Sequence, residues 1–269
     1  MLSVRNVRKT FEAGTAGAHT VLDGVSLHLE PAEFVTIIGS NGAGKSTLFA
    51  VIAGSVFPDE GSVILDGRDI SREKEHQRAR GIGRLFQDPR HGTAPGLTIE
   101  ENLALVYSRA SGRFPLSLAL RSADRSFFRQ VLSRLDMGLE DRLKTPVGSL
   151  SGGQRQALTL LIATLVPPKL LLLDEHTAAL DPVTAKKVLT LTRDITRTHG
   201  ITTLMITHNI SSALEMGTRT IMMNKGRIVM DLRGGERAEL SVEDLLARYK
   251  TTVHENLDSD KLLLDMEKS

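Results

Sequence analysis

Short apolar runs separated by turn residues fill the first third of the chain and predict β-strands. These runs are Leu2–Val7, Val25–Leu29, Phe34–Ile38 and Val63–Leu65. Phe34–Ile38 is nearly all apolar, which is typical of a strand buried on both faces. The dipeptide Asp66–Gly67 predicts a hairpin turn, and Thr47–Ala53 predicts a helix that ends at Gly54.

The middle of the chain, from about residue 88 to residue 149, has a different pattern. Gln130–Leu135 has the spacing of a helix. Arginines recur through this segment: Arg109, Arg113, Arg121, Arg125, Arg129 and Arg134. They are typical of a solvated helical face, and a surface that contacts a partner protein is the alternative.

After residue 150, strands and helices alternate. The predicted strands are Leu170–Leu173 and Ile201–Ile206, followed by a hairpin of Ile221–Met223 and Ile228–Met230. The predicted helices are Leu158–Val166 and Pro182–Thr196, with another starting at Ser241–Asp244. Four consecutive leucines are compatible with a helix, but the flanking proline and aspartate favour a strand.

Composition narrows the class of protein. The 269 residues are enough for one large domain, or for a core that carries a subdomain. Lys and Arg number 34 against 32 Asp and Glu, a net charge of +2, which does not indicate a nucleic-acid-binding protein. With no cysteine, disulfides and thiolate sites are excluded. We see no signal peptide and no apolar run near the roughly 18 residues of a membrane span, so a membrane role would require a partner.

Gly39–Ser46 has the spacing of a phosphate-binding loop between a strand and a helix. Its glycines let backbone N–H groups turn toward phosphate oxygens, and the helix dipole adds to the attraction. Lys45 is expected to neutralise the β- and γ-phosphates, Ser46 to bind Mg²⁺, and Thr47 to bond the α-phosphate. A glycine-rich turn without a ligand is the alternative.

Two carboxylates follow the predicted strand Leu170–Leu173. Asp174 is expected to hold Mg²⁺, and Glu175 to act as the general base that polarises the attacking water. A pair that only caps the next helix is the alternative.

Leu150–Gln154 forms a second candidate phosphate cradle. Ser151 and Gln154 have capping-box spacing, so a helix cap without a ligand is a real alternative. Gly152 and Gly153 weigh against it, because two glycines weaken a first helical turn unless something approaches the backbone closely.

Taken together, Gly39–Ser46, Leu173–Glu175 and Leu150–Gln154 resemble the Walker A loop, the Walker B strand and the signature of the ATP-binding cassette (ABC) family. The resemblance implies an α/β fold: a P-loop NTPase core of ABC type with an antiparallel β subdomain and an inserted α-helical subdomain. It implies an ATPase domain over residues 1–250, with the helical subdomain at about 88–165, and a charged tail over residues 251–269.

The same resemblance implies ATP and Mg²⁺ as cofactors and assigns the remaining roles. Gln87 matches the glutamine that contacts Mg²⁺ and water, Asp181 the loop that communicates across a dimer, and His208 the switch histidine at the γ-phosphate. Phe11 stands where the family places the aromatic ring that stacks on adenine, although a core position is possible. The residues implied to bind nucleotide are Gly39, Ser40, Asn41, Gly42, Ala43, Gly44, Lys45, Ser46, Thr47, Phe11, Ser151, Gly152, Gly153, Gln154 and Asp181.

One departure from the family is His176, which stands where most members have proline; fine-tuning of the site and a packing role are equally open. Asp174–Pro182, Ile206–Asn209, Ile221–Met223 and Ser241–Leu246 resemble a bacterial subgroup of tryptophan- or tyrosine-type uptake ATPases.

The resemblance also implies partners and location. The phosphate loop of one copy and the signature of another would close around two ATP·Mg²⁺, so a homodimer or a closely related ATPase is expected. A permease and, for import, an extracytoplasmic solute-binding protein would complete the system at the cytoplasmic face of the membrane, without nucleic acid. An exporter ATPase and a soluble non-transport ABC ATPase are the alternatives. Against the soluble class, Lys45 and Asp174 are too close for a long inserted coiled coil.

Overall fold

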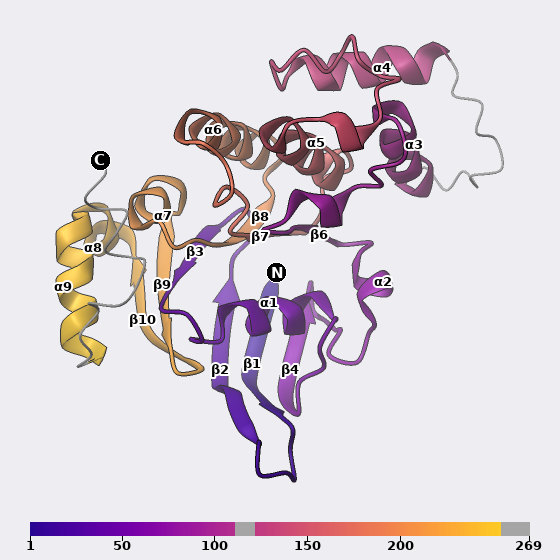
Figure 1. Ribbon diagram of the computed structural model, residues 1–269. Helices are drawn as coiled ribbons and strands as arrows, with labels where there is room; N and C mark the ends of the chain where they lie inside the picture. The colour runs from indigo at the N-terminus through magenta and orange to yellow at the C-terminus, as the bar shows by residue number, and fades with distance from the viewer. Residues whose placement is uncertain (111–121, 254–269) are drawn as a thin grey trace. The chain divides into compact units, whose positions relative to one another are not determined.

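The structure is a computed structural model that describes residues 1–110 and 122–253 (Figure 1). The chain forms two compact units. The first, called the core unit here, comprises Met1–Ile82, Lys169–Glu175 and the chain from Gly200 onward. The second, called the helical unit, comprises Gly83–Pro168 and His176–His199. The chain passes from the core unit to the helical unit directly after Glu175.

The core unit contains an antiparallel sheet in the order β2-β1-β4-β5. Its strands are β1 (Leu2–Phe11), β2 (His19–Leu29), β4 (Glu60–Leu65) and β5 (Arg68–Asp69). Asp66–Gly67 joins β4 to β5, as the turn signal predicts. β1 and β2 are longer than their apolar runs because their outer residues keep pairing as far as Phe11 and His19.

A second sheet runs in the order β10-β9-β3-β8-β7-β6. Its strands are β3 (Phe34–Ile38), β6 (Ile82–Leu85), β7 (Leu170–Asp174), β8 (Thr202–Ile206), β9 (Arg219–Asn224) and β10 (Arg227–Arg233). β3 is parallel to β8 and β9, and β7 is parallel to β8, while β9 and β10 form an antiparallel hairpin. Every residue of β3 and β8 is buried, as the apolar run Phe34–Ile38 predicts.

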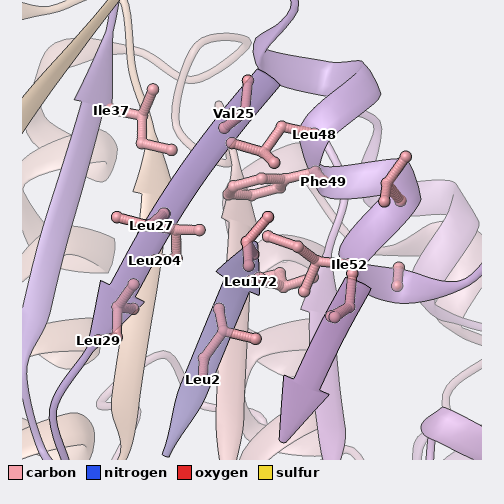
Figure 2. Close-up of a cluster of buried hydrophobic side chains, with 14 of the residues drawn as sticks. Leu2, Val25, Leu27, Leu29, Ile37, Leu48, Phe49, Ile52, Leu172 and Leu204 are labelled. Carbon is pink, nitrogen blue, oxygen red and sulfur yellow. The ribbon is translucent and has the colours of Figure 1, made fainter. Parts of the chain in front are cut away.

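Helices complete the core unit. They are α1 (Lys45–Ala53), α2 (Glu75–Arg78), α7 (Ile210–Met216), α8 (Gly234–Ala238) and α9 (Val242–Val253). In Figure 2, Leu48, Phe49 and Ile52 of α1 point into the cluster that also holds Leu172 and Leu204 of the sheet. A separate cluster packs α9 against α7, β9 and β10 and includes Ile38, the residue before the phosphate loop.

Arg78 holds the end of α1 in place. Its buried guanidinium donates to the carbonyl oxygens of Val51 and Ile52 at 2.7 and 2.9 Å. These two carbonyls belong to the last turn of the helix, where the backbone supplies no partners of its own. Burial lowers the pKa of Arg78, and carbonyl oxygens around the group compensate the loss of water.

The helical unit is built on α3 (Ile99–Ala110), α4 (Ser122–Ser133), α5 (Gly152–Thr164) and α6 (Pro182–His199), with short 3₁₀ turns at Pro89–Gly92 and Val147–Ser149. Its core gathers Leu103, Phe128 and Leu158 from α3, α4 and α5. Within residues 1–110 and 122–253, none of the helices combines the length and the apolar character that spanning a membrane needs.

Several boundaries differ from those expected. The helical unit is wider than residues 88–165, because it also takes in α6. α4 ends at Ser133 rather than Leu135, and α9 continues to Val253, past the expected start of the tail at residue 251.

Of the six arginines, Arg129 and Arg134 are exposed as expected, whereas Arg125 pairs with Glu100 at 2.9 Å. Arg113, Arg121 and the tail from residue 254 lie outside the described residues, as does the side chain of Arg109.

Candidate functional site

Three parallel strands of the core unit end side by side, and the predicted phosphate loop, metal ligand Asp174 and catalytic residue His208 lie at or just after their ends. The phosphate loop begins after β3, His208 lies two residues after β8, and Asp174 is the last residue of β7. β8 lies between β3 and β7, and Ile206 pairs with both Ile37 and Asp174. The carboxyl edge of a parallel sheet is where ligands of open α/β folds bind.

The phosphate loop has a backbone that few side chains would permit. Gly39, Gly42 and Gly44 have φ angles of 151°, 77° and 95°. A Cβ on Gly39 would lie 2.2 Å from the carbonyl oxygen of Met223, and one on Gly44 would lie 2.7 Å from that of Val21. Gly42 has open space around it, so its requirement is conformational only.

Lys45 and Ser46 open α1 at the end of this loop. The Lys45 side chain is buried, and its Nζ donates to the carbonyl oxygens of Gly39 and Ser40 at 2.6 and 2.9 Å. The ammonium group is therefore held inside the loop, where phosphate oxygens are expected. Ser46 is exposed and Thr47 is half-buried at the N-terminus of α1, where an anion is stabilised.

Glu175 and His208, the two predicted catalytic residues of the core unit, are in direct contact. Glu175 Oε1 lies 2.5 Å from His208 Nε2, and the side chains are only 13% and 27% exposed. Glu175 has a left-handed backbone with φ of 46°, and its N–H donates to the Ile206 carbonyl at 3.0 Å. A non-glycine residue in this region is strained, and such strain clusters at functional sites.

Phe11 ends β1 and is half-buried. Its ring stacks on that of His19 with centroids 6.1 Å apart, and Lys9 Nζ lies 5.5 Å from the ring centroid. The role of Phe11 as an adenine platform stays a prediction.

In the helical unit, Ser151 caps α5 as the capping-box pattern predicts. Its Oγ accepts from the Gln154 N–H at 3.2 Å, and Gln154 Oε1 accepts from the Ser151 N–H at 3.3 Å. Ser151 and Gly152 are exposed, so the cap leaves the start of the helix accessible to a ligand.

The two glycines of the signature, Gly152 and Gly153, differ in the space that a side chain would have. A Cβ on Gly153 would lie 2.1 Å from Thr184 Cγ2 of α6, so helix packing accounts for this glycine. A Cβ on Gly152 would meet only Leu180 Cδ2 at 3.7 Å, an ordinary contact. Packing within the described part of the helical unit therefore does not require a glycine at position 152, and its contact with a ligand stays a prediction.

The remaining predicted residues lie in the helical unit. Gln87 is exposed just after β6. Asp181 caps α6 by accepting from the Thr184 N–H at 3.0 Å, and its hydrogen bonds to Thr184 lower the pKa of its carboxyl group. The structure thus gives Asp181 a capping role, and its role across a dimer stays a prediction.

His176 is completely buried against α6, and its Nε2 lies 3.3 Å from Thr192 Oγ1. That hydroxyl donates its hydrogen to the Val188 carbonyl at 2.8 Å, so the histidine must be the donor and carries its hydrogen on Nε2. Burial lowers the pKa of His176 to about 4. The structure supports packing as the role of this neutral histidine.

One contact of the phosphate loop was not predicted. The turn between β9 and β10 touches the loop through Gly226, whose N–H donates to the Ala43 carbonyl at 3.1 Å. The sequence predicts the hairpin itself, but it has no signal for a backbone contact between segments so far apart in the chain.

The donor set fits a nucleotide phosphate with Mg²⁺. Backbone N–H groups at a helix start and an enclosed ammonium suit phosphate oxygens, and the Ser46 hydroxyl with the Asp174 carboxylate are the hard oxygen ligands that Mg²⁺ prefers.

Residues 22–178 match the sequence family described as ABC transporter. The chain is 41% identical over 253 residues to the "Tyrosine transport ATP-binding protein" of Clostridioides difficile (strain R20291), covering 94% of this chain and all of that protein. It is also 39% identical over 217 residues to the "Methionine import ATP-binding protein MetN" of Rhizobium etli, covering 79% of this chain and 57% of that protein.

Solved structures give the same result. An ATP-binding cassette of an ABC transporter in its ADP conformation is similar with a TM-score of 0.75 and 28% identity, covering 94% of this chain and 97% of the other. The dimeric post-hydrolysis state of another cassette, bound to ADP and Pi, has a TM-score of 0.72 and 28% identity, covering 87% and 98%. The predicted fold class is confirmed.

Proposed function

This chain belongs to the ABC transporter family, whose members couple ATP hydrolysis to transport, and we propose that it energises a separate permease for uptake of an amino acid. The observation that supports ATP hydrolysis is the arrangement at the carboxyl edge of the sheet. There β3, β8 and β7 end side by side, and the phosphate loop and the Glu175–His208 pair follow these strands.

Hydrolysis would use residues of this edge. The loop N–H groups and Lys45 would hold the phosphates, and the Ser46 hydroxyl and the Asp174 carboxylate would hold Mg²⁺, which would neutralise charge on the phosphate oxygens. Glu175 accepts the proton of the attacking water. His208 keeps the Glu175 carboxylate in place and contacts the γ-phosphate.

The proposed site is completed by a second copy. Ser151 and Gly152 are exposed at the start of α5, where a helix N-terminus attracts an anion, and Gly152 leaves room for its close approach. Two copies would then enclose two ATP·Mg²⁺, each held by the phosphate loop of one chain and the signature of the other. Similarity to a cassette whose structure is dimeric supports this arrangement.

Uptake of an amino acid is supported by the relatives, whose names refer to tyrosine transport and methionine import. We propose that the chain works at the cytoplasmic face of the membrane with a permease and an extracytoplasmic binding protein. The sequence similarity to tyrosine- or tryptophan-type ATPases favours an aromatic amino acid.

The test is uptake by cells that lack this chain, complemented with the natural chain or with Glu175→Gln. We expect the natural chain alone to restore uptake of one of three labelled amino acids: tyrosine, tryptophan or methionine. Lower retention of preloaded label in cells with the natural chain would instead assign the subunit to an exporter. No difference for any of the three would reject the proposed substrate class.

A further inference from the structure

The turn between β9 and β10 is bonded to the phosphate loop on one side and to β2 on the other. The Gly226 N–H donates to the Ala43 carbonyl at 3.1 Å, and the Gly226 carbonyl accepts from the Asp23 N–H at 2.9 Å. Gly226 thus links two segments that are distant in the sequence. All three segments belong to the core unit.

These segments approach so closely that side chains are excluded. Gly226 has φ of 76°, and a Cβ on it would lie 2.5 Å from the Val21 carbonyl oxygen. A Cβ added to Gly39 of the phosphate loop would likewise lie only 2.2 Å from the carbonyl oxygen of Met223, near the end of β9. A displacement of the turn would therefore displace the phosphate loop, because the Val21 carbonyl lies tightly against Gly226 and the Met223 carbonyl lies tightly against Gly39.

An ion pair fastens the same turn to β2. The Asp23 carboxylate accepts from Arg227 Nε at 2.9 Å and Nη2 at 2.5 Å, and Arg8 Nη2 lies 3.5 Å from its other oxygen. Asp23 is the donor of the backbone hydrogen bond to Gly226, and Arg227 directly follows Gly226. The ion pair between their side chains therefore keeps β2 and the turn aligned at that hydrogen bond.

We propose that Gly226 and the Asp23–Arg227 pair are positioning residues that set the shape of the phosphate loop and thereby its affinity for ATP. The physical reason is that phosphate binding depends on the directions of the loop N–H groups, and small displacements of prepositioned donors are costly. The inference rests on the proposed function only in that the loop must bind ATP.

Gly226→Ala tests the proposal, and Gly67→Ala is the matched control. Gly67 has φ of 77° against 76° for Gly226, but nothing lies within 4 Å of an added Cβ. Both variants carry the same backbone strain, and only Gly226→Ala displaces the turn. We expect the KM for ATP of Gly226→Ala to rise about tenfold with kcat changed far less, and Gly67→Ala to keep the natural KM. The dissociation constant of ATP, from calorimetry, should rise in parallel.

A second pair of variants leaves the backbone unchanged. Arg227→Gln removes the pair with Asp23, while Arg233→Gln removes a comparable exposed pair with Asp231, at 2.8 Å on the same strand. Only Arg227→Gln should raise the KM, by about threefold, and Arg227→Lys should restore part of the affinity. If Gly226→Ala does not fold, the KM values of Arg227→Gln and Arg233→Gln test the proposal by themselves.

Equal KM values for Arg227→Gln and Arg233→Gln, or a Gly226→Ala that folds and binds ATP like the natural chain, would overturn the inference. Failure of the natural chain to bind ATP would instead reject the proposed function, so the two failures are distinguishable.

Discussion

At the scale of single residues, the proposed catalytic contact lies where β7 ends. Glu175 is held in a left-handed conformation by its N–H bond to Ile206 and by His208 Nε2 at 2.5 Å. The order of motifs predicts both residues and their roles. It does not predict their direct contact, which depends on β8 lying beside β7 in the sheet.

His176 shows the limit of reasoning from a single residue. From the sequence, fine-tuning of the site and packing were equally open, because the pattern does not reveal which way a side chain after a strand points. In the structure it is buried and neutral, donating to Thr192. We therefore expect a substitution of His176 to change the stability of the protein.

We predict that acid destabilises the protein through His176. Burial lowers its pKa from the ordinary 6.5 to about 4, so the unfolded chain binds the proton more tightly than the folded one. The stabilisation is complete above pH 6.5 and is lost as the pH falls toward 4. Between pH 7 and pH 4.5 the free energy of unfolding should fall by about 2 kcal/mol from this group.

The measurement is denaturant unfolding of the natural chain and of His176→Gln across that pH range. The variant keeps a hydrogen-bond donor but has no titrating group, so its pH dependence should be shallower by the same amount. Identical slopes for the two proteins would show that His176 does not titrate in this way.

At the scale of elements, the start of α5 combines a helix cap with exposed residues that we propose bind phosphate. The capping-box pattern and the glycine pair are both visible in the sequence, which cannot separate their causes. The structure separates them, because Gly153 packs against Thr184 whereas Gly152 has room for a side chain.

We predict opposite effects for alanine at these neighbouring positions. Gly152→Ala should leave stability unchanged or raise it by up to about 1 kcal/mol, since alanine favours helices, and should lower ATPase activity at least about tenfold. Gly153→Ala should lower stability by about 1 kcal/mol, since Thr184 must move. Thermal unfolding and phosphate release measure both effects. Full activity in a stable Gly152→Ala would mean that no ligand approaches this glycine.

The sequence pattern predicts most helices and strands of the fold, but it predicts the residues at which they begin and end less well. Phe34–Ile38 matches β3 in full because a short, nearly all-apolar run rich in β-branched residues favours a strand buried on both faces. The ends of β1, β2 and α4 were missed because pairing partners and tertiary contacts set them rather than local pattern. The contact of Gly226 with the phosphate loop is a long-range one of the same kind.

At the scale of the whole molecule, the residues proposed to bind and hydrolyse ATP are distributed over two compact units. The phosphate loop, Asp174, Glu175 and His208 belong to the core unit, and Gln87 and the signature belong to the helical unit. The resemblance to the family predicts both sets of residues. The inclusion of α6 in the helical unit could not be predicted, because it depends on packing between α5 and α6 rather than on a sequence boundary.

We propose that the ATPase site is complete only between two copies of the chain, and ATP-dependent dimerisation of Glu175→Gln tests this most directly. This variant should bind ATP and hydrolyse it slowly, so analytical ultracentrifugation with ATP and Mg²⁺ should show a dimer and without nucleotide a monomer. Adding Ser151→Arg, which blocks the exposed cradle, should leave ATP binding intact and return the protein to a monomer. A Glu175→Gln that binds ATP but stays monomeric, or a dimer that persists with Ser151→Arg, would contradict the shared site.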